Sequence, residues 1–216
     1  MPIAPVRGRA LDLSVNRKSI LHGANWWAGE LVIVDVSEID DPKGLPFGDG
    51  AFDIVVLHRT LDALSAVARR QGREFAIRDF LSQAARILTP GGLVVGCVEN
   101  RYGLDRMVGA AARLIGRTAA AVSAVRPLSV LACNRALALA GFEEIRLFSV
   151  LPGPDAPTRL QSIEPGWSRA ACNRQVDALR PPLVRPSIYL IWRVLAQLGV
   201  SQYMGAATFF WGRKPC

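Results

Sequence analysis

The sequence predicts an α/β protein with a doubly wound, mostly parallel β-sheet and a C-terminal appendage. Apolar runs such as LVVGCVE at 93–99 contain no polar alternation, which is typical of parallel strands that are covered on both faces. Amphipathic stretches alternate with these runs, as at 76–88, where apolar residues recur at helical spacing. Helices that alternate with such strands indicate an α/β sandwich.

Apolar runs and turn residues set the expected boundaries of each element. The expected strands are 9–14, 31–36, 52–58, 93–99, 143–151 and 206–214. The expected helices are 59–70, 76–88, 106–125, 131–140 and 187–199. The sequence TPGG at 89–92 ends the second helix and supplies the turn into the next strand, whereas Ser129 caps the fourth helix and Gly141 ends it.

The composition changes beyond residue 151. Proline and tryptophan punctuate residues 152–187, a long irregular stretch that suggests a lid or a segment on the substrate side. We therefore expect an α/β domain over 1–151 and an appendage over 152–216 that packs on the same domain.

The chain of 216 residues carries a formal net charge of +8, nearly all of its positive charge being arginine. An arginine-rich solvated surface is the simpler interpretation, and no aromatic–basic repeat or zinc-finger spacing favours nucleic-acid binding. Contact with an anionic membrane surface stays open, because Arg106, Arg113 and Arg117 are roughly aligned on the helix expected at 106–125. The oligomeric state cannot be read from the sequence.

Cysteine and histidine usage argues against a metal site. The four cysteines form no C-x-x-C pair and only two histidines occur, so we expect no structural zinc. Cys97 lies inside an apolar run and is expected to be a small buried hydrophobe. With no disulfide pattern, no secretion signal and no apolar window of about 20 residues, we expect a cytoplasmic protein.

Three stretches in a fixed order resemble a known family. LPFGDGAFDIVVLHRTLDAL at 45–64, ARILTPGGLVVGCVEN at 85–100 and LALAGFEEIRLF at 137–148 resemble the later half of class I S-adenosylmethionine-dependent methyltransferases of the type 11, small-molecule kind. The resemblance covers roughly residues 31–151. It implies a Rossmann-like fold with S-adenosylmethionine as cofactor.

The first part of the chain departs from this family's pattern. Where the family shows LDLG-x-G-x-G after its first strand, this chain has LDLSVNRKS, so that Asp12 fits but Ser14, Asn16 and Lys18 replace the glycines. Asp35 fits the acid that accepts the ribose hydroxyls if 31–36 is the second strand. If 31–36 is the third strand, that acid is absent. In either case about one βα unit is lost or compressed before residue 45.

The resemblance implies a site at the carboxyl ends of the strands, where ligands of doubly wound sheets bind. The expected cofactor-binding residues are Asp12, Ser14, Asp35, Val36, Leu57, His58 and Arg59. His58 is also the candidate catalytic residue, as a general base or by orienting the acceptor, and a structural hydrogen bond to the backbone is an equal alternative.

Residues after the strand at 93–99 are expected on the acceptor side. The candidate substrate-binding residues are Glu99, Asn100, Arg101 and Tyr102. The alternatives are helix capping by Asn100 and a surface ion pair between Glu99 and Arg101. Asp53, at the entering end of its strand, is expected to accept backbone N–H bonds and to have a structural role.

The leading functional interpretation is methyl transfer from S-adenosylmethionine to a small-molecule or glycan-like acceptor. The alternative is a catalytically inactive relative that serves as a binding or assembly partner. It follows from the replaced glycines, because a side chain there would meet the amino-acid part of the cofactor.

Overall fold

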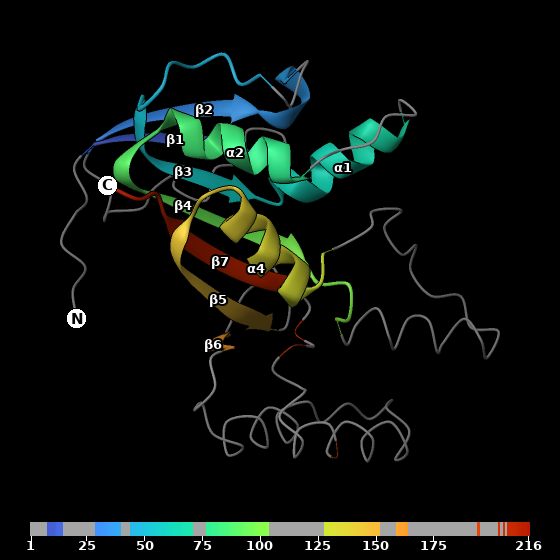
Figure 1. Cartoon of the computed structure of the whole chain (residues 1–216). Helices are drawn as coiled ribbons and strands as arrows, with labels where there is room; N and C mark the ends of the chain where they lie inside the picture. Colours follow the sequence, from blue (N-terminus) through green and yellow to red (C-terminus); the bar gives the residue numbers. More distant parts are fainter. Residues whose placement is uncertain are drawn as a thin grey trace.

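The computed structural model describes residues 8–14, 29–39, 44–70, 77–103, 128–151, 159–163, 194, 203, 205 and 207–216 (Figure 1). Several sequence expectations lie outside these residues. They concern the helix at 106–125 with its three arginines, most of the helix at 187–199 and of the irregular stretch at 152–187, and the replaced glycine positions 16 and 18.

The strands expected from the sequence are present with bounds within one residue of the expected ones, except for β4, which begins five residues earlier. They are β1 (Arg9–Ser14), β2 (Glu30–Asp35), β3 (Phe52–His58), β4 (Leu88–Glu99), β5 (Glu143–Leu151) and β7 (Ala207–Arg213), and a short β6 (Arg159–Ser162) was not expected. The helices are the 3-10 turn η2 (Val36–Glu38) and the α-helices α1 (Thr60–Arg70), α2 (Ile77–Ile87) and α4 (Val130–Leu139). The Ser129 cap is confirmed, since its Oγ accepts a hydrogen bond from the Ala132 backbone N–H at 3.2 Å.

The strands form one sheet in the order β2-β1-β3-β4-β7-β5-β6. The first four of these are mutually parallel, whereas β7 runs antiparallel to both β4 and β5. A mostly parallel α/β sheet is therefore confirmed. The division at residue 151 stays a prediction, although β6 and β7, which come after it, are hydrogen-bonded members of this sheet.

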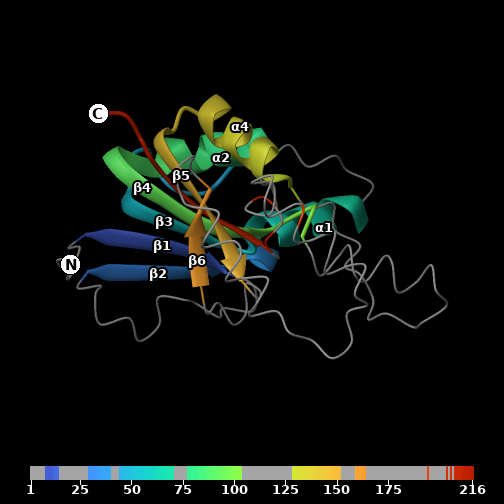
Figure 2. The ribbon, with the colours of Figure 1, turned by 90° about the horizontal axis from the view of Figure 1, so that it is seen from below.

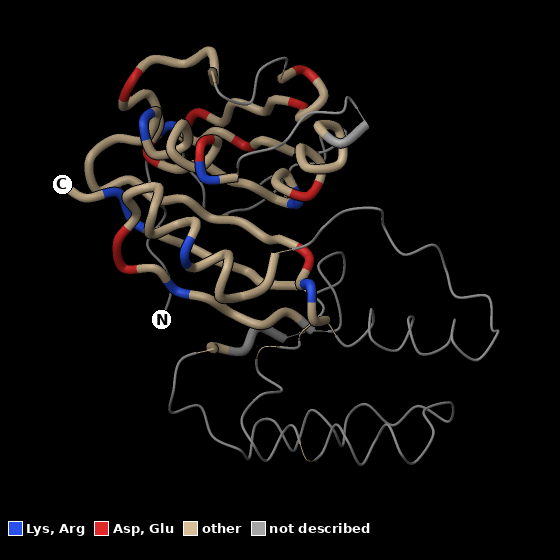
Figure 3. The backbone as a smooth tube through the Cα atoms, turned by 45° about the vertical axis from the view of Figure 1, so that its right-hand side comes forward, with Lys and Arg blue, Asp and Glu red and all other residues tan. Residues whose placement is uncertain are grey.

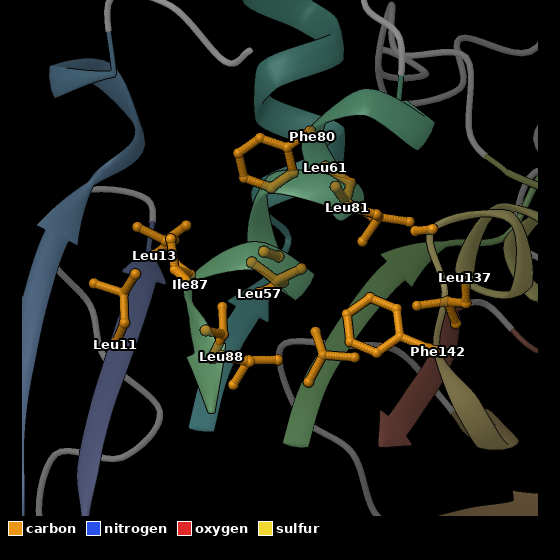
Figure 4. Packing of buried hydrophobic residues seen from close by; sticks show 14 of the residues in the cluster. Leu11, Leu13, Leu57, Leu61, Phe80, Leu81, Ile87, Leu88, Leu137 and Phe142 are labelled. Atoms are coloured by element: carbon orange, nitrogen blue, oxygen red, sulfur yellow. The ribbon is translucent and has the colours of Figure 1, made fainter. Parts of the chain in front are cut away.

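The three described α-helices cover one face of the sheet (Figures 1 and 2). Their apolar side chains meet strand residues in a single core, which Figure 4 shows from close by. The core includes Leu11, Leu13, Leu57, Leu61, Phe80, Leu81, Ile87, Leu137 and Phe142. The opposite face is buried as well, where Ala10, Ile54 and Val56 form a smaller cluster.

The turn expected at 89–92 is wrong in one respect. Helix α2 ends at Ile87, one residue before the expected end, and the TPGG sequence already belongs to β4, which begins at Leu88 instead of Leu93. The chain accommodates it by a register shift in the pairing between β3 and β4. Gly91 has a φ of +75°, a left-handed conformation that glycine adopts without steric cost.

The hydrogen bonds at the amino end of β3 explain why Asp53 stands at the start of a buried strand. The Asp53 carboxylate accepts the Arg9 backbone N–H from β1 at 2.8 Å and the Thr89 hydroxyl from β4 at 3.1 Å. Asp53 therefore joins three neighbouring strands at the end opposite to the expected site. This confirms the structural role expected from the sequence.

Candidate functional site

The sheet reverses its winding between β1 and β3. From β1 the chain continues to β2 on one side, and from β2 it returns to β3 on the other side. In doubly wound sheets the crevice at such a switch point, outside the carboxyl ends of the strands, is where ligands bind. The candidate site therefore lies around the ends of β1, β2 and β3.

The position of β2 decides between the two interpretations of Asp35. In doubly wound sheets the second strand lies beside the first, and the third lies outside it. Here β2 pairs directly with β1, with Asp35 opposite Ser14 in the register. This position corresponds to the second strand, so Asp35 lies where the ribose acid is expected.

Strand alternation places the polar candidates on one face. Leu13, Leu57 and Val98 belong to the core beneath the helices, Val34 of β2 packs against that core, and successive side chains of a strand point to opposite faces. The side chains that alternate with these core residues therefore lie on the face away from α1, α2 and α4. They are Asp12, Ser14, Asp35, His58 and Glu99. By contrast, Val36 and Leu57 are buried in the helix-side core, so we expect them to meet a ligand through their backbone only.

Ser14 and Asp35 differ in how the fold uses them. Ser14 is fully buried, and its Oγ has no hydrogen-bond partner among the described residues. Asp35 is half-buried and caps η2, because its Oδ1 accepts the Ser37 backbone N–H at 2.8 Å and the Ser37 hydroxyl at 2.6 Å. The cap fixes the direction of the carboxylate at the end of β2.

The turn after β3 is strained and firmly held. Arg59 has a φ of +58°, an uncommon conformation for a residue with a side chain. Its backbone N–H donates to the Cys97 carbonyl at 3.0 Å, and its guanidinium lies 2.9 Å from the Glu99 carboxylate. The next residue, Thr60, donates its buried hydroxyl to the Leu13 carbonyl and so joins β1 to the start of α1.

The end of β4 is organised by two buried polar residues. Asp62, on α1, accepts the Glu99 backbone N–H at 2.9 Å. Asn100 is almost fully buried and donates its side-chain amide to the carbonyls of Tyr203 at 2.6 Å and Gly205 at 2.9 Å. Asn100 thus connects the end of β4 to the segment that precedes β7.

The contacts of Glu99 and Asn100 differ from the ion pair and the helix cap that were the alternatives to acceptor binding. Glu99 pairs with Arg59 instead of Arg101. Asn100 holds the chain ahead of β7, while its Oδ1 accepts the Tyr102 backbone N–H at 3.2 Å. Tyr102 is exposed, and the Arg101 guanidinium lies 5.7 Å from the centre of its ring. Glu99 and Asn100 are therefore joined to the strand ends, whereas Arg101 and Tyr102 lie farther outside.

Sequence reasoning missed Thr60 and Asp62. Both lie in the first turn of α1, directly after the strand end at His58. Their position in the sequence marks them as neighbours of the site, but their bonds to Leu13 and Glu99 depend on strands that are distant along the chain. No group of three or more histidine, cysteine or acidic residues in the described part of the chain is arranged to hold a metal ion. Within the same part, no helix has the length and apolar character needed to cross a membrane.

Comparisons with solved structures agree with this architecture. A methyltransferase from Thermotoga maritima, described as S-adenosylmethionine-dependent and a possible histamine N-methyltransferase, is similar with a TM-score of 0.54 and 14% identity, over 96% of this chain and 82% of that one. An S-adenosylmethionine-dependent methyltransferase from Archaeoglobus fulgidus is similar with a TM-score of 0.54 and 12% identity, over 99% and 89% of the two chains.

A third similar structure contains a cofactor product. It is phosphoethanolamine N-methyltransferase 2 from Haemonchus contortus in complex with phosphomonomethylethanolamine and S-adenosylhomocysteine, with a TM-score of 0.52 and 13% identity, over 100% of this chain and 50% of that one. No protein-family model and no curated protein sequence matches the chain. Together, the sheet and these similarities show the fold of class I S-adenosylmethionine-dependent methyltransferases.

Proposed function

We propose that this protein transfers a methyl group from S-adenosylmethionine to a small-molecule acceptor. The observation that carries the proposal is the position of Ser14, Asp35 and His58 on one sheet face, at the carboxyl ends of the neighbouring strands β1, β2 and β3 around the switch point. Similar structures at low identity support the fold, and the small-molecule acceptor named for the Haemonchus protein favours the same class of acceptor here.

The residues at the switch point fit the cofactor. Ser14 Oγ is a buried polar atom without a hydrogen-bond partner in the described chain, and the capped Asp35 carboxylate lies beside it. We assign the ribose hydroxyls to Asp35, with Val36, Leu57 and Arg59 contributing through their backbone. The cofactor, when bound, supplies a methyl group on a positively charged sulfur.

The protein contributes mainly positioning, which can supply much of the acceleration of a displacement reaction. His58 is assigned to orient the acceptor or to take its proton, and Glu99, Arg101 and Tyr102 to line the acceptor side. Asn100 is assigned an indirect role, because its hydrogen bonds hold the end of β4 in place. A cytoplasmic location and membership of the type 11 group belong to the same proposal, as does a glycan-like compound among the acceptors.

Calorimetric titration with S-adenosylmethionine and S-adenosylhomocysteine tests the proposal. Asp35→Asn keeps an oxygen that can cap η2 but removes the negative charge, so we expect affinity for both ligands to fall by about 10-fold to 100-fold. Asp49→Asn is the matched control, because Asp49 is 79% exposed in the loop before β3, at the amino end of that strand. No heat with either ligand at millimolar concentration contradicts the enzymatic function.

The second candidate function is that of an inactive relative acting as a binding or assembly partner. It is favoured by Ser14, whose side chain lies where the family has a glycine, and by β2, which is the outermost strand on its side of the described sheet. This candidate predicts a melting temperature that neither ligand changes. A shift to higher temperature with S-adenosylhomocysteine rejects it.

A further inference from the structure

The Arg101 guanidinium is a cation without a carboxylate partner in the described part of the chain. Arg101 and Tyr102 are both exposed, in the turn that follows the carboxyl end of β4. At the same edge of the sheet, Arg59 is paired with Glu99 at 2.9 Å. No described carboxylate lies within ion-pair distance of Arg101, whose side chain lies beside the Tyr102 ring instead. The charge of Arg101 is therefore available to an anionic ligand.

The backbone of this turn is firmly held. The Arg101 N–H donates to the Leu128 carbonyl at 3.0 Å. The Tyr102 N–H donates to the Asn100 side-chain oxygen at 3.2 Å, and the Gly103 N–H donates to the Asn100 carbonyl at 3.1 Å. Asn100 is itself almost fully buried and is bonded to the segment ahead of β7. The turn is thus anchored in the sheet, whereas its two large side chains are exposed.

The Tyr102 ring restrains the cation further. The Arg101 guanidinium carbon lies 5.7 Å from the centre of this ring, which is within the range of cation–π attraction. A side chain that is already restrained loses less conformational entropy when a ligand binds. The planar fork of guanidinium N–H donors matches the oxygens of a carboxylate or a phosphate. The pair is therefore suited to an acidic ligand.

The register of the sheet relates this pair to the proposed site. Cys97, the register partner of His58, precedes Arg101 by four residues, so His58 and Arg101 belong to neighbouring strand ends. We propose that Arg101, restrained by Tyr102, binds an anionic group of the acceptor, either a carboxylate or a phosphate. This inference rests on the proposed function and names the acceptor as an acidic small molecule. Its charged group lies at the end away from the atom that is methylated.

The experiment compares two pairs of probes that differ in charge. The first pair is para-hydroxybenzoate and para-hydroxybenzamide, and the second is phenyl phosphate and phenol. Each probe is titrated calorimetrically into protein saturated with S-adenosylhomocysteine, using the wild type, Arg101→Gln and Tyr102→Leu. Arg78→Gln is the matched control, because it removes the same charge from an exposed arginine that lies on α2 beside Asp79.

We expect the wild-type protein to bind the charged member of a pair about 10-fold more tightly than the neutral one. Arg101→Gln should remove this preference, Tyr102→Leu should reduce it about 2-fold to 5-fold, and Arg78→Gln should leave it unchanged. Both turn variants should melt at the wild-type temperature, because the bonds of the turn come from its backbone and Asn100. A preference in either pair supports the inference, and the pair with the larger preference identifies the anionic group.

Three results overturn the inference and leave the proposed function standing. The first is equal affinity of the wild-type protein for charged and neutral probes. The second is a preference that Arg101→Gln retains. The third is an equal loss in Arg78→Gln, which would assign the preference to the net positive charge of the protein. Saturation with S-adenosylhomocysteine is measured separately, and if this ligand does not bind, the proposed function itself fails.

Discussion

The Arg59 guanidinium lies 2.9 Å from the Glu99 carboxylate and so joins the carboxyl ends of β3 and β4 across 40 positions of the chain. The pair is supported from both sides. The Arg59 backbone N–H is bonded to Cys97, and the Glu99 backbone N–H is bonded to Asp62. Side chain and backbone together therefore fix the edge of the sheet at which the acceptor is expected.

The left-handed backbone of Arg59 gives a stability prediction. At a φ of +58° glycine is free of the strain that any side chain causes, so Arg59→Gly should unfold at a higher urea concentration than Arg59→Ala. The expected difference is about 1 kcal/mol. Both variants lose the ion pair with Glu99, which cancels in the comparison. Equal stability of the two variants would show that the residue relaxes out of this conformation.

The Asp53 carboxylate should contribute more to stability than any exposed acid near it. Asp53→Ala leaves the Arg9 backbone N–H and the Thr89 hydroxyl without their acceptor, at a cost of roughly 1–3 kcal/mol in the free energy of unfolding. The control is Asp49→Ala, since the exposed pair of Asp49 with Arg86 is worth about 0–1 kcal/mol. Chemical denaturation measures both, and an equal loss for the two would refute this role.

The stability of the protein should depend on the hydrogen-bond donors of the Asn100 side chain. Asn100→Asp places a carboxylate against the two carbonyl oxygens that now accept from the amide, so it should destabilise the protein more than Asn100→Ala. The alanine variant should lose roughly 1–3 kcal/mol. Thermal and urea unfolding are the measurements. An aspartate variant that is the milder of the two would mean that these carbonyls do not hold the residue.

Arg86 should control the loop ahead of β3. Its guanidinium donates to the backbone carbonyls of Phe47 at 2.8 Å and Leu45 at 2.9 Å. Lysine cannot present two donors in the same fork, so Arg86→Lys should lose roughly 1 kcal/mol or more. Faster amide hydrogen exchange at residues 45–50, with little change in β5, would identify the loop as the affected part. Uniform changes over the sheet would contradict a local role.

The Cys133 thiol should stay protonated in the folded protein. Burial raises the pKa of Cys133 to about 12, with smaller contributions in the same direction from Cys97 and Asp62. Its thiol should therefore not react at pH 8 until the protein unfolds, because the thiolate is the reactive form. The measurement is thiol titration of a variant with Cys97→Ala, Cys172→Ser and Cys216→Ser, in which Cys133 is the single remaining thiol. Rapid reaction of the native variant would contradict it.

The raised pKa of Cys133 should make the free energy of unfolding fall at alkaline pH. The pKa of a cysteine in the unfolded chain is about 8.5, so on raising the pH the unfolded state loses this proton first. The folded state is then increasingly disfavoured. The contribution of the Cys133 thiol is complete below about pH 8.5 and is lost progressively toward pH 12. A Cys133→Ala variant should lack this part of the alkaline decline in the free energy of unfolding.

The distribution of charge on the described part of the chain agrees with an arginine-rich surface that is exposed to solvent. Acidic and basic residues are interspersed along it (Figure 3). The ion pairs there include exposed ones such as Arg9 with Glu30 and Arg78 with Asp79. The aligned arginines of 106–125 lie outside this part, so contact with an anionic membrane stays a prediction. Sedimentation with anionic vesicles at low and high salt measures it.

The sequence by itself determined the local elements and the order in which they occur. Strand β3 follows from the apolar run at 54–57, and the ends of α4 follow from a capping serine and a terminal glycine, all of which act within a few residues. The burial of Cys97 and the structural role of Asp53 followed from the same local patterns. The class of fold could be predicted because alternating buried strands and amphipathic helices have few stable arrangements.

Only the tertiary structure decided which distant elements meet. The antiparallel insertion of β7 between β4 and β5, the pairing of Arg59 with Glu99 and the contact of Asn100 with Gly205 join positions far apart along the chain. No periodicity encodes such pairings, because they depend on the strand order of the whole sheet. The rank of β2 among the strands, on which the proposed role of Asp35 depends, likewise needed the pairing of β2 with β1, because the sequence of an apolar strand does not reveal its neighbours in a sheet.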